Sequence, residues 1–594
     1  MSINERVAAL RKEMEIHGID AVIIPSSDPH QSEYVADHWK SREWISGFTG
    51  SAGTAVVCKD HAGIWTDSRY FISAEQELAS SEFELHKLNV QGNAEYADFL
   101  RDHLKQGAKI SLDGNVLSLG LSKHLAAEFQ SAEMHFVTDL DLINLAWTDR
   151  PSLPKEAIFE HNIKYAGKTI SEKLADIRAK MKSLGADYHL INTLDDIAWT
   201  FNIRGKDVEC NPVAIAYAVI AKEEAFIFID ESKIPTPLNE KLVSNAVQIQ
   251  AYSSLVPFLS TLSQDQSILV DMNTTSVSVY NAISTKHIIK GSTIPLHLKA
   301  IKNETEISHI REVMVKDGVA LTKLFMWLEE TVKARSISEV EISEKMYSFR
   351  SEQANFHGES FTSIIGYKGN GAIVHYRPDK KTCAMVEADG ILLTDSGGQY
   401  DDGTTDITRT IAMGKPTEEQ KRNYTLVLKG HIGLARAKFP KGTRGVQLDI
   451  LAREHLWAHG LNYLHGTGHG VGFFLNVHEP PQGLAPGLSM RGRTVIEPGM
   501  FTSNEPGYYK EGEYGIRIEN CVLTIVDESV EKGNFLKFET LTLFPIDTQL
   551  LEVSMLTKEE TTWLNDYHAE VYEKLAPRLS EKEQIWMKEK CQKL

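Results

Sequence analysis

The segment RVAALRKEMEIHGIDAVII, residues 6–24, aligns without gaps on a later segment, KLADIRAKMKSLGADYHLI, residues 173–191. In each copy, apolar residues recur at helical spacing up to a glycine, Gly18 or Gly185, and a short apolar run follows. This order predicts an amphipathic helix that ends at glycine and then a strand, which is how an α/β unit begins. The repeat predicts two related N-terminal α/β domains, although unrelated helix–glycine–strand units would share much of this pattern.

Two further changes along the sequence divide the chain into three parts. The segment AWTDRPSLPKEAIF, residues 146–159, has two prolines and no periodicity, which is typical of a linker. Near residue 300 a long amphipathic helix is expected to begin, with Asn303 or Thr305 as its N-cap. We therefore expect domains at residues 1–153, 154–300 and 301–594.

The composition is that of an ordinary globular protein and excludes several classes of function. The net charge of -18 and the absence of any Lys/Arg-rich run make nucleic acid an unexpected partner. No run of 18 apolar residues and no signal-peptide core occur, so neither a membrane span nor secretion is expected. The five cysteines are scattered and form no CxxC pair, which predicts reduced thiols in a cytoplasmic protein.

Asp395 and Asp406 stand on either side of a Gly/Asp-rich turn in GILLTDSGGQYDDGTTDITRTIAM, residues 390–413. Two β-rich runs flank the turn, so Asp395 is expected to end one strand and Asp406 to begin the next. Carboxylates that face each other across a hairpin repel unless a cation lies between them. The pair is a candidate metal clamp, although aspartate near a glycine turn is also ordinary turn chemistry.

Three histidines, His465, His469 and His478, crowd into LHGTGHGVGFFLNVHE, residues 464–479, among four glycines. Glycine lets the backbone pass close to a ligand, and imidazole is a common metal ligand and acid/base group at neutral pH. Packing alone explains three such histidines poorly, so the segment is a second candidate part of a site. A solvated surface loop is the alternative.

The third segment is SNEPGYYKEGEYGIRIEN, residues 503–520, with two short arms around a Lys-Glu-Gly turn. In its last part, Ile516 to Glu519, the strand period of two puts Arg517 and Glu519 on one face and the two isoleucines on the other. Glu505 precedes a proline-glycine turn. A polar site and a salt-bridged sheet face would both show this pattern.

In their order along the chain, Asp395, Asp406, His469, Glu505 and Glu519 resemble the five metal ligands of the pita-bread metallopeptidases. Within that superfamily the chain resembles the long, three-domain form of the aminopeptidase P family. The resemblance covers nearly the whole chain and includes SDPHQSEY, SGFTGSAGTAVV, IWTDSRYF, NGAIVHYRP and WLNDYH. It implies two α/β domains of creatinase N-terminal type, followed by a C-terminal pita-bread catalytic domain with a C-terminal extension.

The resemblance implies an Xaa-Pro aminopeptidase, a hydrolase that removes the first residue from peptides whose second residue is proline. Four carboxylates and one imidazole favour hard divalent ions, and two Mn²⁺ ions are expected. In the family, Asp406 and Glu519 contact both ions, Asp395 completes the shell of one, and His469 with Glu505 completes the shell of the other. The ions would activate a shared water for attack on the scissile carbonyl.

The resemblance also assigns roles to side chains around these ligands. Glu505 would accept and return the proton, and Arg517 would help to hold the charge of the bridging ligands. His375 and His478 would flank the substrate and stabilise the tetrahedral intermediate, with His465 nearby. These four residues are therefore candidate catalytic residues in addition to Glu505.

Two residues of the first domain, Glu33 in HQSEY and Arg69 in DSRY, match positions that reach over the site in this subfamily. A carboxylate there would bind the free α-amine of the peptide, which would restrict cleavage to the terminal residue. Ordinary surface charges are the alternative for both positions.

Several other functions share the expected fold. Prolidase, which cleaves Xaa-Pro dipeptides, is the main alternative. Methionine aminopeptidase is disfavoured because it lacks the two extra N-terminal domains. Creatinase is disfavoured because it works without metal, whereas all five candidate ligands are present here. A non-catalytic pita-bread binding protein is the alternative of another class, but such relatives have lost metal ligands that this sequence keeps. By resemblance the chain is also expected to form a homodimer.

Overall fold

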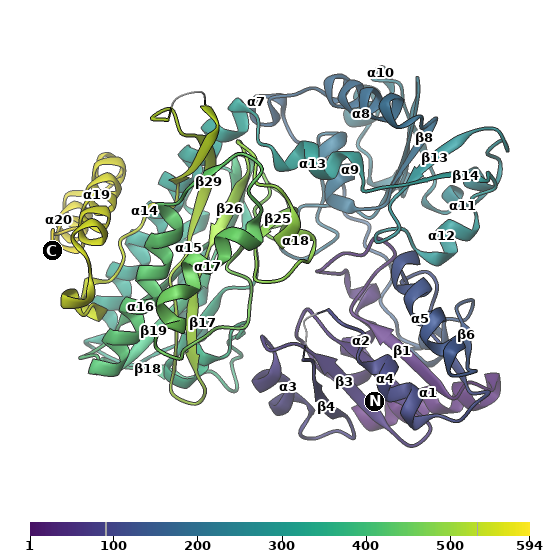
Figure 1. Cartoon of the computed structure of the whole chain (residues 1–594), viewed down its shortest axis with the longest axis horizontal. Coiled ribbons are helices and arrows are strands. Elements are labelled where there is room, and N and C mark those ends of the chain that lie inside the picture. Colours follow the sequence, from purple (N-terminus) through teal and green to yellow (C-terminus); the bar gives the residue numbers. More distant parts are fainter. Residues whose placement is uncertain (90–91, 531–532) are drawn as a thin grey trace. The chain divides into compact units, whose positions relative to one another are not determined.

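The computed structural model describes residues 1–89, 92–530 and 533–594. The chain forms two compact units, one made of residues 1–162 and 168–296 and the other of residues 163–167 and 297–594 (Figure 1). The first unit contains both copies of the sequence repeat. The domain boundaries at residues 153 and 300 stay predictions. None of the described helices combines the length and the apolar composition needed to cross a bilayer.

The first unit holds two six-stranded sheets of the same design. Corresponding strands have the same order and the same parallel or antiparallel pairing in both sheets. The first sheet has the order β4 (Glu84–Lys87), β3 (Ala62–Thr66), β2 (Thr54–Cys58), β1 (Ala21–Pro25), β5 (Lys109–Ser111) and β6 (His135–Val137). The second has the order β12 (Val247–Gln250), β11 (Ala225–Phe228), β10 (Tyr217–Ala221), β8 (Tyr188–Ile191), β13 (Ser267–Val270) and β14 (His287–Lys290).

The repeated segments form equivalent elements in the two sheets. Helices α1 (Ile3–His17) and α8 (Ile170–Leu184) each begin with a capping box. Each helix ends at a glycine in the left-handed region, Gly18 with φ +64° and Gly185 with φ +72°. The strand that follows each helix lies inside its sheet. The predicted duplication is confirmed.

The two sheets of this unit are joined by a contact that each copy makes with the same segment. The N-cap residues Ser118, of α5 (Leu119–Ser131), and Ser276, of α12 (Val277–Asn281), form an antiparallel bridge. The amides on either side donate across it at 2.9 Å in both cases, Leu119 to the Thr275 carbonyl and Val277 to the Leu117 carbonyl. Each copy therefore contributes the equivalent segment to this contact, as the two subunits of a two-fold symmetric pair do.

The second unit is built from long helices and antiparallel sheets. Its helices include α14 (Glu304–Val332), α15 (Glu339–Ser351), α16 (Glu418–Ala435), α17 (Gly445–Trp457), α19 (Lys558–Leu575) and α20 (Glu581–Lys590). The helix predicted near residue 300 is α14, and Asn303, not Thr305, is its N-cap. Asn303 caps the helix because its side chain accepts a hydrogen bond from the backbone N–H of Glu306. The Glu306 side chain in turn accepts from the backbone N–H of Asn303, which completes a capping box.

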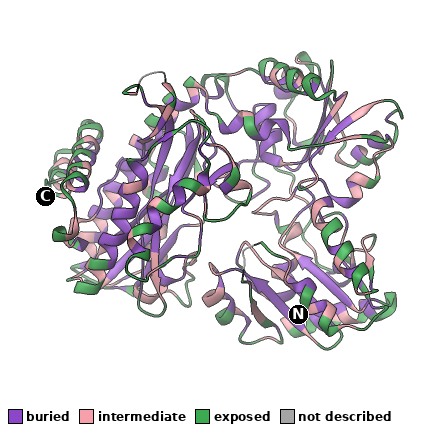
Figure 2. Cartoon of the chain, in the orientation of Figure 1, coloured by how far each residue is buried: buried purple, intermediate pink, exposed green. Residues whose placement is uncertain are grey.

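Three groups of strands in this unit carry the polar segments found in the sequence. One sheet has the order β17 (Ile364–Tyr367), β19 (Ile391–Ser396) and β22 (Ile407–Ala412). The largest has the order β23 (Lys438–Pro440), β30 (Phe535–Thr540), β29 (Asn520–Val526), β26 (Phe501–Asn504), β24 (Gly468–Gly470) and β25 (Glu479–Leu484). A separate hairpin pairs β27 (Gly507–Lys510) with β28 (Tyr514–Arg517). Figure 2 shows most of the strands of this unit as buried and the helices around them with exposed outer sides.

Candidate metal centre

Asp395 lies on β19 and Asp406 directly precedes the neighbouring strand β22, so the two residues flank the turn as predicted, but they are not directly opposite. The register pairs Asp395 with Thr408, two residues after Asp406. Residues two apart along a strand share a face, so both carboxylates are on the same side of the sheet. The turn is longer than expected because a second small hairpin, β20 (Gly398–Tyr400) with β21 (Gly403–Thr404), stands between them.

The other candidate ligands are held by the largest sheet. His469 is the middle residue of β24, which pairs with β26. Glu505 directly follows β26, and Glu519 directly precedes β29. Because Asn504 pairs with Asn520 in these two strands, the two glutamates leave the sheet at the same end. The backbone N–H of Glu519 also donates to a carbonyl of β22, which brings the two sheets together at the site.

The five candidate ligands form one cluster in the interior of the second unit. His469 Nε2 lies 3.5 Å from Asp406 Oδ2 and 3.4 Å from Glu505 Oε1. One ligand atom each from Asp406, His469 and Glu519 can be chosen so that all lie within 4.8 Å of one another. Four of the five residues are buried, and the Glu505 side chain is 17% exposed. The structure therefore brings together side chains that the sequence spreads over more than a hundred residues.

The electrostatics of the cluster favour bound cations. Burial, and then repulsion from neighbouring carboxylates, raises the pKa of Asp406 and of Glu519 well above the usual values. Burial raises the pKa of Glu505 to about 7, against the opposing effect of Arg517. Buried carboxylates of this kind are stable as anions only when positive charge lies beside them.

Two carboxylate oxygens at the site are placed to coordinate a metal ion directly. Among the described residues, no hydrogen-bond donor reaches the buried Asp395 Oδ1 or Glu519 Oε1. His469 donates from Nδ1 to the Gly470 carbonyl at 2.9 Å, which directs the lone pair of its Nε2 toward the carboxylates. The donor set of carboxylate oxygens and one imidazole thus fits hard divalent metal ions.

Arg517 is the cation that the protein itself supplies to this cluster. Its buried guanidinium donates to Asp395 Oδ2 at 2.6 Å and to Thr408 Oγ1 at 3.2 Å. Thr408 Oγ1 in turn donates to Glu519 Oε2 at 2.7 Å. Arg517 therefore orients one oxygen of Asp395 and, through Thr408, one oxygen of Glu519. Arg517 and Glu519 contact the same site, as the alternation in the sequence predicted.

Tyr509 is a site residue that the sequence analysis missed. Its hydroxyl accepts from Arg517 Nη1 at 2.6 Å and lies 2.8 Å from His465 Nε2. Because His465 Nδ1 donates to the Gly466 carbonyl at 2.8 Å, its Nε2 accepts from the tyrosine hydroxyl. A chain of hydrogen bonds thus joins His465 to Asp395. The register of the hairpin, which the sequence does not give, places Tyr509 and Arg517 on the same face.

The remaining predicted histidines differ in how closely they join the cluster. The His478 ring meets the His469 ring edge to face, with 4.4 Å between ring centroids. His375 directly follows Val374, whose carbonyl accepts from Arg517 Nη2 at 3.3 Å. Both histidines are half-buried, so each keeps a surface that a bound peptide can reach. Their contacts with substrate stay predictions.

Glu33 and Arg69 belong to the first unit and lie near each other. Arg69 is mostly buried and donates from Nη2 to Asp67 Oδ2 at 2.8 Å. The side-chain hydrogen bond to Asp67, and more weakly the charge of Glu33, raises the pKa of Arg69 against the effect of burial. The pair is thus not a set of ordinary exposed surface charges. Its contact with substrate stays a prediction.

A buried arginine connects the ligands to the C-terminal motif WLNDYH. Arg409, on β22, donates from Nη1 to the Glu519 carbonyl at 2.6 Å and from Nη2 to the Tyr567 hydroxyl at 2.9 Å. Tyr567 donates to the Phe544 carbonyl at 2.9 Å. The motif therefore supports the backbone that carries Glu519, although the motif and Glu519 are distant in sequence.

Comparisons with known proteins match every part of this architecture. The description Creatinase/Prolidase N-terminal domain matches residues 6–143 and again residues 149–306. Metallopeptidase family M24 matches residues 308–525, and the C-terminal region of peptidase M24 matches residues 534–594. The two N-terminal matches agree with the duplicated sheets.

Full-length relatives are similar over the whole chain. Xaa-Pro aminopeptidase 1 of Dictyostelium discoideum is 40% identical, covering 100% of this chain and 97% of the relative. Aminopeptidase P2 of Arabidopsis thaliana is 38% identical, covering 97% and 86%. The crystal structure of X-prolyl aminopeptidase from Caenorhabditis elegans, described as a cytosolic enzyme with a di-nuclear active site, has a TM-score of 0.95 and 33% identity, covering 100% of both chains. With its clustered candidate metal ligands, its duplicated N-terminal domains and these relatives, the chain belongs to metallopeptidase family M24.

Proposed function

We propose that this protein is an Xaa-Pro aminopeptidase, which hydrolyses the first peptide bond of peptides whose second residue is proline. The observation that carries the proposal is the buried cluster of Asp395, Asp406, His469, Glu505 and Glu519, with two carboxylate oxygens that lack a protein donor among the described residues. Relatives that bear the Xaa-Pro aminopeptidase name, at about 40% identity over the full chain, support the choice of substrate.

The cluster would hold two divalent ions. Asp406 and Glu519 would contact both, Asp395 would complete the shell of one, and His469 with Glu505 would complete that of the other. Four carboxylates carry a formal charge that two divalent ions neutralise, and hard oxygen ligands favour Mn²⁺. Such ions supply an activated water and polarise the scissile carbonyl.

The protein's own residues handle the proton and position the substrate. Glu505, whose carboxylate lies 3.4 Å from His469 Nε2, would accept a proton from the attacking water and return it to the leaving proline nitrogen. Arg517 holds Asp395 in place. His478, beside His469, and His375 would donate to the oxygen on which negative charge develops.

The first unit would supply the restriction to the terminal residue. A free α-amine is a cation, and the carboxylate of Glu33, beside Arg69 and Asp67, would bind it. We also infer a cytoplasmic location, because the C. elegans neighbour is described as cytosolic and the scattered cysteines need no oxidising compartment. The homodimer implied by the family resemblance stays a prediction.

The proposal is tested with one tripeptide Xaa-Pro-Xaa and the corresponding dipeptide Xaa-Pro, each with the Mn²⁺-loaded protein. We expect release of the first residue from the tripeptide and near-complete loss of this activity in Glu505→Gln. Glu511→Gln, a change of the same chemistry at an exposed turn, is the matched control and should leave activity intact. Strict preference for the dipeptide would favour a prolidase, and no hydrolysis with bound metal would favour a non-catalytic binding protein.

A further inference from the structure

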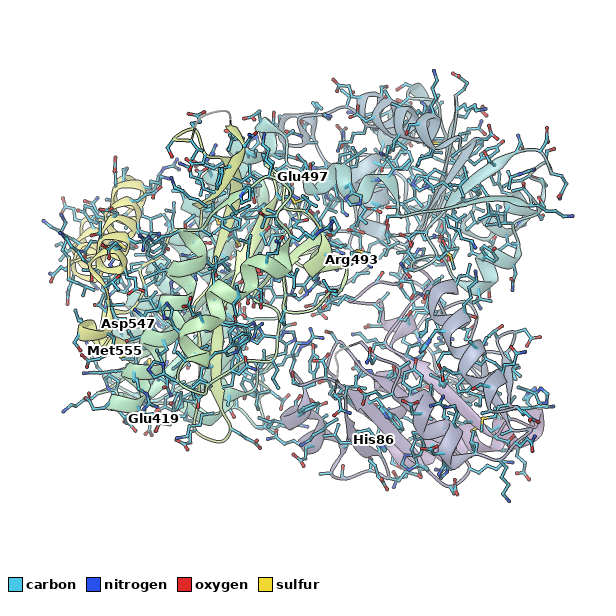
Figure 3. All side chains as sticks on the ribbon, viewed as in Figure 1. His86, Glu419, Arg493, Glu497, Asp547 and Met555 are labelled. Atoms are coloured by element: carbon cyan, nitrogen blue, oxygen red, sulfur yellow. The ribbon has the colours of Figure 1, made fainter. Side chains whose placement is uncertain are left out.

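A second group of metal-binding side chains lies in the first unit, apart from the metal centre. Glu84 and His86 are two residues apart on β4, so they share one face of the sheet. His61 directly precedes β3, the strand that pairs with β4. One ligand atom from each of the three residues can be chosen so that all lie within 4.8 Å of one another. Figure 3 labels His86 on this strand.

The spacing of the two imidazoles matches a tetrahedral metal ion. His61 Nε2 and His86 Nε2 lie 3.3 Å apart. Two nitrogens that each bind zinc at about 2.0–2.1 Å, with a tetrahedral angle between them, are separated by about 3.3–3.4 Å. Both histidines therefore already present the same nitrogen at the separation that one zinc ion requires.

A glycine makes room for this arrangement. A Cβ added to Gly63 would lie 2.8 Å from His61 Nε2 and 2.9 Å from His86 Cδ2, which is too close for any side chain. The His86 ring also stacks on Trp65, with 3.9 Å between ring centroids and 5° between planes. Gly63 thus leaves space for both imidazoles, and the stacking on Trp65 orients the His86 ring, so less side-chain entropy remains for that ring to lose on binding a metal.

The surroundings keep the histidines neutral and accessible. Burial lowers the pKa of His61 and of His86, which favours the neutral form that binds metals. The other titratable groups with an electrostatic effect on the two rings are Glu84, Asp60, His103 and Arg11. Glu84 is exposed and both imidazoles are only partly buried, so an ion and a water ligand can enter from solvent.

We propose that His61, Glu84 and His86 bind one Zn²⁺ ion, with water in the fourth position. Two imidazoles and one carboxylate are a ligand set that zinc accepts readily, whereas Mn²⁺ prefers sites richer in oxygen. This site shares no residue with the cluster of the second unit, so it would bind metal independently of the peptidase function.

The experiment compares zinc binding by the full-length Mn²⁺-loaded protein and its variants. Each is titrated with Zn²⁺ against a chromophoric chelator, and bound metals are counted by mass spectrometry after dialysis. The parent should bind one more Zn²⁺ per chain than His61→Ala/His86→Ala. His124→Ala, which removes an exposed histidine from α5 in the same unit, is the matched control and should bind like the parent.

Glu84→Gln should not disturb the fold, because Glu84 is exposed. The affinity of this variant for zinc should fall about 100-fold or more. Crystals soaked in Zn²⁺ should show an anomalous peak between His61 and His86. Equal zinc counts for the parent and the double variant, or the absence of this peak, would overturn the proposal. Peptidase activity and zinc-free thermal unfolding should be unchanged in Glu84→Gln, so failure of the zinc site and failure of the peptidase assignment remain distinguishable.

Discussion

Two backbone segments lie so close together near the metal centre that the effect of adding one methyl group between them can be calculated. Gly515, on β28, packs against Gly371 of the NGA segment. A Cβ on Gly515 would lie 1.7 Å from the Gly371 carbonyl oxygen and 2.3 Å from its carbonyl carbon. Real Cβ atoms essentially never approach within 3.0 Å, so Gly515→Ala requires a displacement of at least about 1.3 Å.

That displacement falls on backbone that carries site residues. Arg517 is two residues from Gly515, and His375 is four residues from Gly371. Overpacking of this kind costs about 1–3 kcal/mol of stability. A misplacement of about 1 Å in an active site reduces the rate about 100-fold. We therefore expect kcat/KM for a Xaa-Pro-Xaa peptide to fall about 100-fold, although the protein still folds.

The assay measures kcat/KM and the free energy of unfolding in urea for both the parent and the variant. Gly487→Ala is the control, because nothing lies within 4 Å of an added Cβ there and the backbone is not in the left-handed region. A kcat/KM for Gly515→Ala within about threefold of the parent, a change of less than 1 kcal/mol, would contradict the coupling of this glycine contact to the site.

Three further predictions concern the hydrogen-bond chain, the metal and buried histidine. Tyr509→Phe removes a hydroxyl that accepts from Arg517, so kcat should fall about 10-fold with little change in KM, as steady-state kinetics will show; an unchanged kcat contradicts this role. Dialysis against a chelator should abolish hydrolysis and lower the Tm, and Mn²⁺ should restore both; activity in metal-free protein contradicts the metal centre. Burial lowers the pKa of His189 to about 4, so between pH 4 and 6.5 the unfolded state binds more protons than the folded state. Stability should therefore fall as the pH drops through this window, by about 2 kcal/mol at pH 5 from this residue, and urea unfolding of the parent and His189→Gln should differ in this pH dependence.

The sequence picks out the residues that the structure clusters because their types and local patterns are both visible, and the family resemblance implies their role as metal ligands. Carboxylates beside turns and histidines among glycines are unusual enough to be noticed, and strand alternation places Arg517 and Glu519 on one face. The offset between Asp395 and Asp406 is not visible. It depends on the extra hairpin between β19 and β22, whose pairing is set by the strand β16 (Phe356–Glu359), from another part of the chain.

Supporting residues were harder to predict, since their partners are distant in sequence. In the sequence, Arg409 has the pattern of an ordinary strand residue. In the structure it is buried and donates to the carbonyls of Glu519 and Pro545. Tyr567 was noticed only as part of a family motif, and its hydrogen bond to Arg409 gives that motif a physical role. Tyr509 becomes visible only when the hairpin register is known.

The bridge between Ser118 and Ser276 also has a thermodynamic consequence for the first unit. In that bridge each copy of the duplicated domain presents the same segment to the other, and the hydrogen bonds are exchanged reciprocally. This reciprocity has the form of an isologous contact between two equal subunits. Because both copies belong to one polypeptide, the contact forms without the loss of translational and rotational freedom that two separate chains would incur.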